Sequence, residues 1–142
     1  MLIESFKVTT YNNIETEELG CKFSQTISNG DIIALNGNLG SGKTTFVKGV
    51  LKGLNYQNEV TSPTYTLINE YYTGIYSLIH VDCYREKNIN RWLNIGLIDY
   101  LSGDNILFIE WAENIQSILP KEINNIYFDT LDTNQRLIKC NE

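Results

Sequence analysis

A glycine-rich motif in the first third of the chain constrains the fold more than any other feature. Residues 37–44 read Gly-Asn-Leu-Gly-Ser-Gly-Lys-Thr, which matches the pattern G-x-x-x-x-G-K-[ST]. In this pattern the glycines let the backbone curl until successive N–H groups point inward, and no Cβ blocks the approach of a phosphate. The motif carries this meaning when it follows a buried strand and opens a helix.

The segments on either side of the motif have the required patterns. Residues 31–36 form a short apolar run of strand length, and residues 44–54 carry apolar side chains at helical spacing. The N-terminus of such a helix adds partial positive charge beside a bound anion. We therefore predict a phosphate-binding loop, in which Lys43 reaches the β- and γ-phosphates and the Thr44 hydroxyl holds Mg²⁺. The alternative is a glycine-rich turn with no ligand.

Length and net charge limit the number of domains and the kinds of partner that this protein can have. The chain has 142 residues, so we expect one domain over residues 1–142. Its net charge of −6 argues against free-standing nucleic-acid binding, although action on RNA through a basic partner stays open. No apolar stretch is long enough to span a membrane, and residues 1–6 lack the pattern of a secretion signal. Three widely spaced cysteines indicate reduced thiols, and we expect a cytoplasmic protein.

Strand and helix patterns alternate along the chain. Strands are predicted at residues 2–10, 31–36, 66–72, 75–82, 105–110, 123–128 and 135–140. Helices are predicted at residues 13–28, 44–54, 88–101 (two short pieces broken near 94–96) and 115–119. This order indicates an α/β protein, a three-layer P-loop fold around a mixed, mainly parallel central sheet. Thr73-Gly74 predicts a hairpin, which makes the sheet mixed.

Two carboxylates at strand ends are candidates for the anion that holds a metal ion. Asp82 ends the run Ile-His-Val-Asp, and Glu110 ends the run Ile-Leu-Phe-Ile-Glu. Buried parallel strands place such residues at the carboxyl edge of the sheet, where ligands bind in α/β folds. We favour Glu110 for the metal because its apolar run is cleaner. Asp82 would then order the attacking water or support the metal's water shell.

Other side chains have less specific signals. The hydroxyl-rich segment at residues 61–65 suits a sensor of the γ-phosphate, or it is a plain connector held extended by its proline. His80 is the only histidine, and a lone histidine on a strand is more often a satisfied core residue than a catalyst. Arg85 could neutralise phosphate charge or pair with Asp82, or form a weak surface ion pair. Trp111 is either core packing or an exposed anchor for a partner.

These motifs, taken in order, resemble those of one family. The loop at residues 37–45 is followed by Ser-Pro-Thr-Tyr at 62–65, His-x-Asp-x-Tyr-Arg at 80–85 and Glu-Trp at 110–111. The chain thereby resembles the TsaE (YjeE) family of small bacterial P-loop ATPases over almost its whole length. The absence of an N-K-x-D guanine reader agrees with ATP as the nucleotide.

The resemblance implies a function and its partners. Such a protein binds ATP and Mg²⁺ and hydrolyses ATP, chiefly when docked on the proteins TsaD and TsaB. That complex adds a threonylcarbamoyl group to the adenosine beside the anticodon, so tRNA is contacted only indirectly. A small-molecule P-loop kinase is an alternative, but kinases normally carry an arginine-bearing lid and none is obvious here. A nucleotide-sensing scaffold without useful turnover is another.

The resemblance also implies roles for individual residues. Thr44 and Glu110 would hold Mg²⁺, and Thr64 and Asp82 would lie near the γ-phosphate. Trp111 belongs to the functional Glu-Trp pair, and the adenine would lie against the stretch from Asn13 to Thr16. The remaining phosphate-binding positions are those of the loop: Gly37, Asn38, Leu39, Gly40, Ser41, Gly42, Lys43, Thr44 and Thr45. Departures from the family pattern are Asn38 in place of Asp, Cys83 in place of Leu, and Ala112 in place of Pro.

Overall fold

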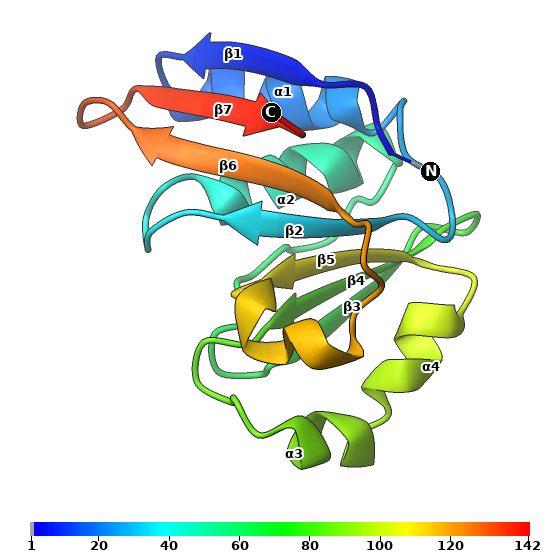
Figure 1. Ribbon diagram of the computed structural model, residues 1–142. Coiled ribbons are helices and arrows are strands. Elements are labelled where there is room, and N and C mark those ends of the chain that lie inside the picture. Colours follow the sequence, from blue (N-terminus) through cyan, green and yellow to red (C-terminus); the bar gives the residue numbers. More distant parts are fainter. Residues whose placement is uncertain (1) are drawn as a thin grey trace.

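Seven strands form one sheet that runs through the molecule (Figure 1). The computed structural model describes residues 2–142. The strands are β1 (Phe6–Thr10), β2 (Ile32–Asn36), β3 (Ile68–Tyr72), β4 (Ser77–Asp82), β5 (Ile106–Glu110), β6 (Asn124–Thr130) and β7 (Arg136–Cys140). The helices are α1 (Asn13–Phe23), α2 (Lys43–Gly53), α3 (Ile89–Asn94), α4 (Leu97–Ser102) and the 3₁₀ helix η1 (Ala112–Ile118).

The strand order is β1-β7-β6-β2-β5-β4-β3. The four central strands β6, β2, β5 and β4 pair in parallel, whereas the β3–β4, β6–β7 and β1–β7 pairings are antiparallel. The predicted mixed α/β sheet is therefore confirmed. Three of the six strand pairings are parallel and lie in the centre; hairpins add β3 on one side and β7 on the other, and β1 pairs with β7 at the edge. The carboxyl ends of the parallel strands meet at one edge, on the left of Figure 1.

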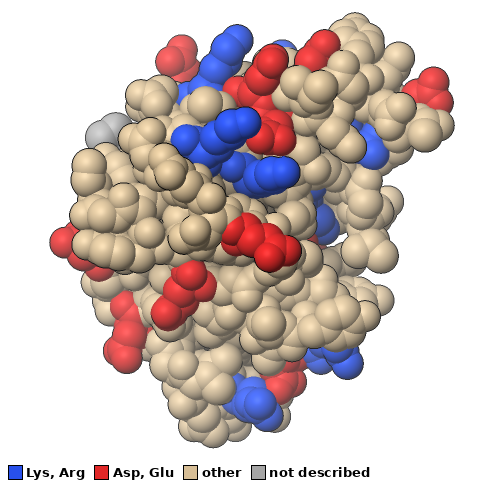
Figure 2. Space-filling model, turned by 180° about the vertical axis from the view of Figure 1, so that it is seen from behind, with Lys and Arg blue, Asp and Glu red and all other residues tan. Residues whose placement is uncertain are grey.

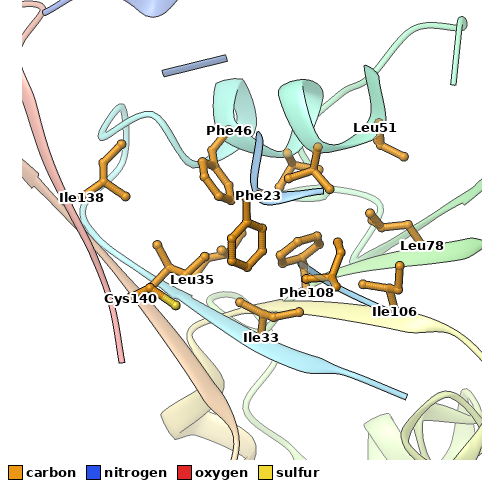
Figure 3. Close-up of a cluster of buried hydrophobic side chains, with 14 of the residues drawn as sticks. Phe23, Ile33, Leu35, Phe46, Leu51, Leu78, Ile106, Phe108, Ile138 and Cys140 are labelled. Carbon is orange, nitrogen blue, oxygen red and sulfur yellow. The ribbon is translucent and has the colours of Figure 1, made fainter. Parts of the chain in front are cut away.

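Side chains of the central strands are buried on both faces of the sheet. Phe108 of β5 belongs to a cluster with Phe23 of α1 and Phe46 of α2 (Figure 3). Ile109, its neighbour in sequence, belongs to the opposite cluster with Trp92 of α3. This alternation explains the nearly continuous apolar run of β5, because every position faces one core or the other. The helices therefore form two layers, with the sheet between them.

Helices α1 and α2 approach each other so closely that glycine is required where they cross. A Cβ at Gly49 of α2 would overlap the carbonyl oxygen of Glu17 in α1, and a Cβ at Gly20 would overlap the carbonyl oxygen of Phe46. The two backbones therefore pack directly against each other. This contact fixes the position of α2, and α2 begins at the lysine of the glycine-rich motif.

Several predicted boundaries were wrong. Helix α1 ends at Phe23, not at Ser28, because the hydroxyls of Ser24 and Thr26 donate to the carbonyls of Cys21 and Phe23 and compete with helical hydrogen bonds. The first strand begins at Phe6 rather than at residue 2. The last helix is a 3₁₀ helix that starts at Ala112, three residues before the predicted start.

The N-terminal end of α1 is capped, and the predicted break in the later helical region is confirmed. Asn12 caps α1 by accepting the N–H of Glu15 at 2.9 Å. The helical region after residue 88 is split in two at Gly96, whose φ of 87° is left-handed. Within residues 2–142, no helix has the length and apolar character needed to cross a bilayer.

The face seen in Figure 2 carries basic and acidic side chains side by side. Lys and Arg gather in a band near the upper middle of this view, with Asp and Glu beside them. Such a mixed face is not the uniform basic surface that a free-standing nucleic-acid binder presents.

Candidate nucleotide-binding site

The glycine-rich motif forms the predicted loop between β2 and α2. Residues 37–42 connect the end of β2 to Lys43, the first residue of α2. Gly42 has a φ of 101°, a conformation that favours glycine. At Gly37, a Cβ would lie 2.9 Å from the carbonyl oxygen of Phe128, so glycine is also needed to bring the loop close to β6. The strand–loop–helix arrangement predicted from the sequence is confirmed.

A cavity of about 590 Å³ opens beside this loop. Its volume lies within the usual range for small-molecule sites. Twelve predicted site residues line it: Asn13, Asn38, Leu39, Gly40, Gly42, Lys43, Thr44, Thr45, Thr64, Asp82, Glu110 and Trp111. Ser62 of the hydroxyl-rich segment and Tyr84 of the motif at 80–85 also line it, and so do Asn134 and Arg136, which the sequence did not indicate. Figure 2 shows the molecule from behind, so the carboxyl ends of the parallel strands lie on the right in that view, and the surface is hollowed at this edge.

Lys43 connects the start of the glycine-rich loop to Glu110 at the end of β5. Its Nζ donates to the carbonyl oxygen of Gly37 at 2.6 Å and lies 3.2 Å from Oε1 of Glu110. The side chains of Lys43 and Glu110 are almost completely buried. A lysine ammonium at this depth, beside the first turn of α2, concentrates positive charge where an anion would enter.

Glu110 and Asp82 lie opposite each other in the β4–β5 register, and both are buried. Burial pushes the pKa of Glu110 upward, but the hydrogen bond and charge of His80 and the charge of Lys43 outweigh it, so this pKa lies below its ordinary value. Burial raises the pKa of Asp82, and the negative charge of Glu110 adds to the rise. The N–H of Tyr84, 2.8 Å from Oδ1 of Asp82, opposes it. Glu110 is thus kept ionised, while Asp82 takes up a proton more readily.

His80 is fully buried, and its Nε2 lies 2.7 Å from Oε2 of Glu110. The sequence favoured a satisfied core residue. The burial agrees with that interpretation, but Nδ1 has no hydrogen-bond partner among residues 2–142, and the neighbour of Nε2 is a carboxylate of the cavity. His80 therefore fixes the far side of Glu110 while Lys43 contacts the near side.

The hydroxyl-rich segment at residues 61–65 forms one wall of the cavity. Ser62 and Thr64 both line it, and their hydroxyl oxygens lie 2.7 Å apart. Tyr65 points outward and is 83% exposed, and the guanidinium of Arg85 lies 5.0 Å from its ring centre. Arg85 therefore neither lines the cavity nor pairs with Asp82 in this structure. It connects this wall to the segment that follows β4.

Trp111 lines the cavity beside Tyr84. Their ring centres are 4.9 Å apart, and Nζ of Lys43 lies 5.9 Å from the indole centre. Trp111 has a φ of 58°, which is uncommon for a residue other than glycine. Such a strained backbone at a cavity is typical of a functional position.

Three predicted residues support the cavity without lining it. Gly37 contributes its carbonyl oxygen to Lys43. Ser41 is buried, and its hydroxyl has no hydrogen-bond partner among residues 2–142. Thr16 is buried with its hydroxyl 2.7 Å from that of Thr10. Of the stretch predicted to meet an adenine, Asn13 therefore reaches the cavity and Thr16 lies behind it.

The donors present fit a magnesium ion that is bound together with a polyphosphate. Within residues 2–142, no group of three or more His, Cys, Asp and Glu side chains could hold a metal by itself. Mg²⁺ is usually bound by one or two protein oxygens together with substrate phosphates. The hydroxyl of Thr44 and the carboxylate of Glu110 both line the cavity and supply that kind of donor.

Comparison with known proteins agrees with this geometry. The model of the family "Threonylcarbamoyl adenosine biosynthesis protein TsaE" matches residues 10–138. This chain belongs to the TsaE family. The tRNA threonylcarbamoyladenosine biosynthesis protein TsaE of Bacillus subtilis is 38% identical over 84% of this chain and 75% of its own length. The Haemophilus influenzae protein of the same name is 42% identical over 69% of this chain and 64% of its own length.

A solved structure shares the fold of this TsaE family member. The crystal structure of YdiB from Bacillus subtilis superposes with a TM-score of 0.81 and 32% sequence identity. The match covers 99% of this chain and 86% of that one. The family and the α/β P-loop architecture expected from the sequence are thus both confirmed.

Proposed function

We propose that this TsaE family member binds ATP with Mg²⁺ in the cavity beside α2 and hydrolyses it. It would act as the ATP-hydrolysing subunit of the machinery that makes threonylcarbamoyladenosine in tRNA, docked on TsaD and TsaB in the cytoplasm. Contact with tRNA would be indirect, and residues 1–142 would work as one domain. The observation that carries the proposal is the buried Lys43–Glu110 pair at the loop, in a cavity large enough for a nucleotide.

The proposed roles follow from position and charge. Lys43 and the backbone N–H groups of the loop bind the phosphates, helped by the N-terminus of α2. Thr44 and Glu110 hold Mg²⁺, which supplies charge neutralisation at the β- and γ-phosphates. The depressed pKa of Glu110 suits this role because a metal ligand must be ionised.

We assign Asp82 and Thr64, which both line the cavity, to the terminal phosphate. Because burial raises the pKa of Asp82, this carboxylate is a better proton acceptor than an exposed aspartate. We assign to Asp82 the ordering of the attacking water. To the hydroxyls of Thr64 and Ser62, which also line the cavity, we assign hydrogen bonds to the γ-phosphate. To Asn13 and Asn134, which line the cavity as well, we assign contacts with the nucleoside.

Calorimetry with ATP and Mg²⁺, followed by ATPase assays with and without TsaD and TsaB, tests the proposal. Lys43→Ala should abolish stable ATP binding, because it removes the buried cation of the loop. Lys48→Ala is the matched control: Lys48 lies on the same helix but is exposed, so its loss should leave affinity unchanged.

Unchanged affinity in Lys43→Ala would refute the phosphate-binding role. ATP binding without stimulated turnover in the reconstituted complex would favour a nucleotide-sensing scaffold. A phosphorylated small molecule among the products would favour a kinase.

A further inference from the structure

Arg136, the first residue of β7, connects the glycine-rich loop to the hairpin loop between β6 and β7. Its Nε donates to the carbonyl oxygen of Ser41 at 3.1 Å, and its Nη2 donates to that of Gly40 at 3.0 Å. The partners are 95 and 96 positions away in sequence. The fork of one guanidinium therefore holds two successive carbonyls of the loop.

These two contacts fix the orientation of two peptide groups. In a trans peptide the N–H points opposite to the C=O, so a held carbonyl also sets its N–H. The carbonyl of Ser41 shares its peptide with the N–H of Gly42, which lines the cavity. The side chain of Arg136 also packs over Gly42, where a Cβ would lie 3.9 Å from Arg136 Cγ. Arg136 thus constrains the part of the loop in which Gly42 adopts its left-handed conformation.

The other end of the guanidinium holds the hairpin loop. Nη1 donates to the carbonyl oxygens of Asp132, Thr133 and Gln135 at 3.1, 3.2 and 3.0 Å. This loop carries Asn134, which also lines the cavity. Among residues 2–142, Arg136 belongs to no ion pair within 4.0 Å, so its donors go to backbone carbonyls. Two walls of the cavity are consequently held at a fixed distance by one side chain.

We propose that Arg136 is a positioning residue of the phosphate site, whose two-sided fork sets the shape of the glycine-rich loop. The inference rests on the proposed ATP binding and deepens it. The fork is essential because a single ammonium cannot bond to both loops with the same geometry. Affinity for any polyphosphate therefore depends on the guanidinium itself, and not merely on a positive charge near the cavity.

Calorimetry with ATP and with inorganic tripolyphosphate, each at fixed Mg²⁺, tests the inference on Arg136→Met and Arg136→Lys. Both variants should bind both ligands at least about tenfold more weakly, since each loses charge-assisted hydrogen bonds to the loop. The two ligands should lose affinity by the same factor, because the loop binds what they share. Arg91→Met is the matched control, since Arg91 is an exposed arginine on α3 outside the cavity, and its affinity should stay at the wild-type value.

Four outcomes would overturn the inference while the wild-type protein still binds ATP. Wild-type affinity in both Arg136 variants would show that the loop keeps its shape alone. Retained affinity in Arg136→Lys only would show that charge suffices. A loss confined to ATP would place Arg136 on the nucleoside. A lower melting temperature with unchanged affinity would leave Arg136 a structural role only. Failure of the wild-type protein to bind either ligand would refute the proposed function itself.

Discussion

His80 and Glu110 form a buried pair on neighbouring strands, with 2.7 Å between the imidazole Nε2 and the carboxylate Oε2. Glu110 is thereby held from two sides, because its other oxygen lies 3.2 Å from Nζ of Lys43. With both oxygens in contact with a partner, the carboxylate of Glu110 has little freedom to rotate. The geometry of a metal ligand is usually set by such a supporting partner.

Replacing His80 should weaken both the fold and the site. In His80→Leu, the buried Glu110 loses the imidazole 2.7 Å from its Oε2, and the free energy of unfolding should fall by about 1.5–3 kcal/mol. Mg²⁺-dependent ATP hydrolysis in the reconstituted complex should fall as well, because Glu110 is then drawn toward Lys43 alone. His80→Gln, which keeps an N–H donor, should retain more of both. Urea unfolding and ATPase assays measure the two effects, and a His80→Leu protein as stable as the wild type would contradict the pairing.

Asp82→Asn should stabilise the protein at neutral pH while lowering turnover. Burial raises the pKa of Asp82, so the folded state binds this proton more tightly than the unfolded chain does. The stability from that proton is fully present below the ordinary value of 3.8 and is lost as the pH rises through the higher folded value. Asparagine carries no charge at any pH, and its Oδ1 can still accept the N–H of Tyr84.

The gain in Asp82→Asn should therefore be seen at pH 7 and vanish near about pH 3. Urea unfolding at both pH values measures it. Asp104→Asn is the control, because Asp104 is exposed and should change little at either pH. A gain that is larger at the acidic pH would contradict a raised pKa of Asp82 in the folded protein.

The parts of the site that the sequence predicted are those with local patterns. The loop at residues 37–44 and the strand-end acids Asp82 and Glu110 each follow an apolar run, so the sheet's topology brings them together. Asn134 and Arg136 had no such signal. Their place in the cavity depends on the hairpin between β6 and β7 lying beside a loop 95 positions earlier in the chain.

Competition between local and tertiary interactions explains the remaining differences between the predicted and the observed structure. The apolar spacing beyond Phe23 continues at Ile27, which is buried, so the pattern indicated a longer helix. The hydroxyls of Ser24 and Thr26 end that helix by donating hydrogen bonds to its carbonyls, in competition with backbone N–H groups. Helix propensity alone does not reveal which of these donors the carbonyls accept. For His80, the sequence indicated burial but not the carboxylate on the adjacent strand.

The two tryptophans should report nucleotide binding differently. Trp111 lines the cavity, 5.9 Å from Nζ of Lys43, and packs against the edge of a hydrophobic cluster in which Trp92 is fully buried and outside the cavity. ATP should therefore change the fluorescence of the wild-type protein through Trp111. The change should persist in Trp92→Phe and disappear in Trp111→Phe. A signal that follows Trp92 instead would show that binding alters the hydrophobic cluster around Trp92.

Gly49→Ala should destabilise the protein although alanine is the better helix former. In an exposed helix this replacement would add up to about 1 kcal/mol of stability. Here the new Cβ would overlap the carbonyl of Glu17, so α1 and α2 must separate, at a cost of about 1–3 kcal/mol. Lys48→Ala, at the exposed neighbouring position, should change stability by less than about 0.5 kcal/mol. Because α2 begins at Lys43, displacement of this helix should also weaken ATP binding. Urea unfolding measures the loss of stability, and calorimetry on the same preparation measures the loss of affinity. A Gly49→Ala protein that is more stable than the wild type would contradict the close helix contact.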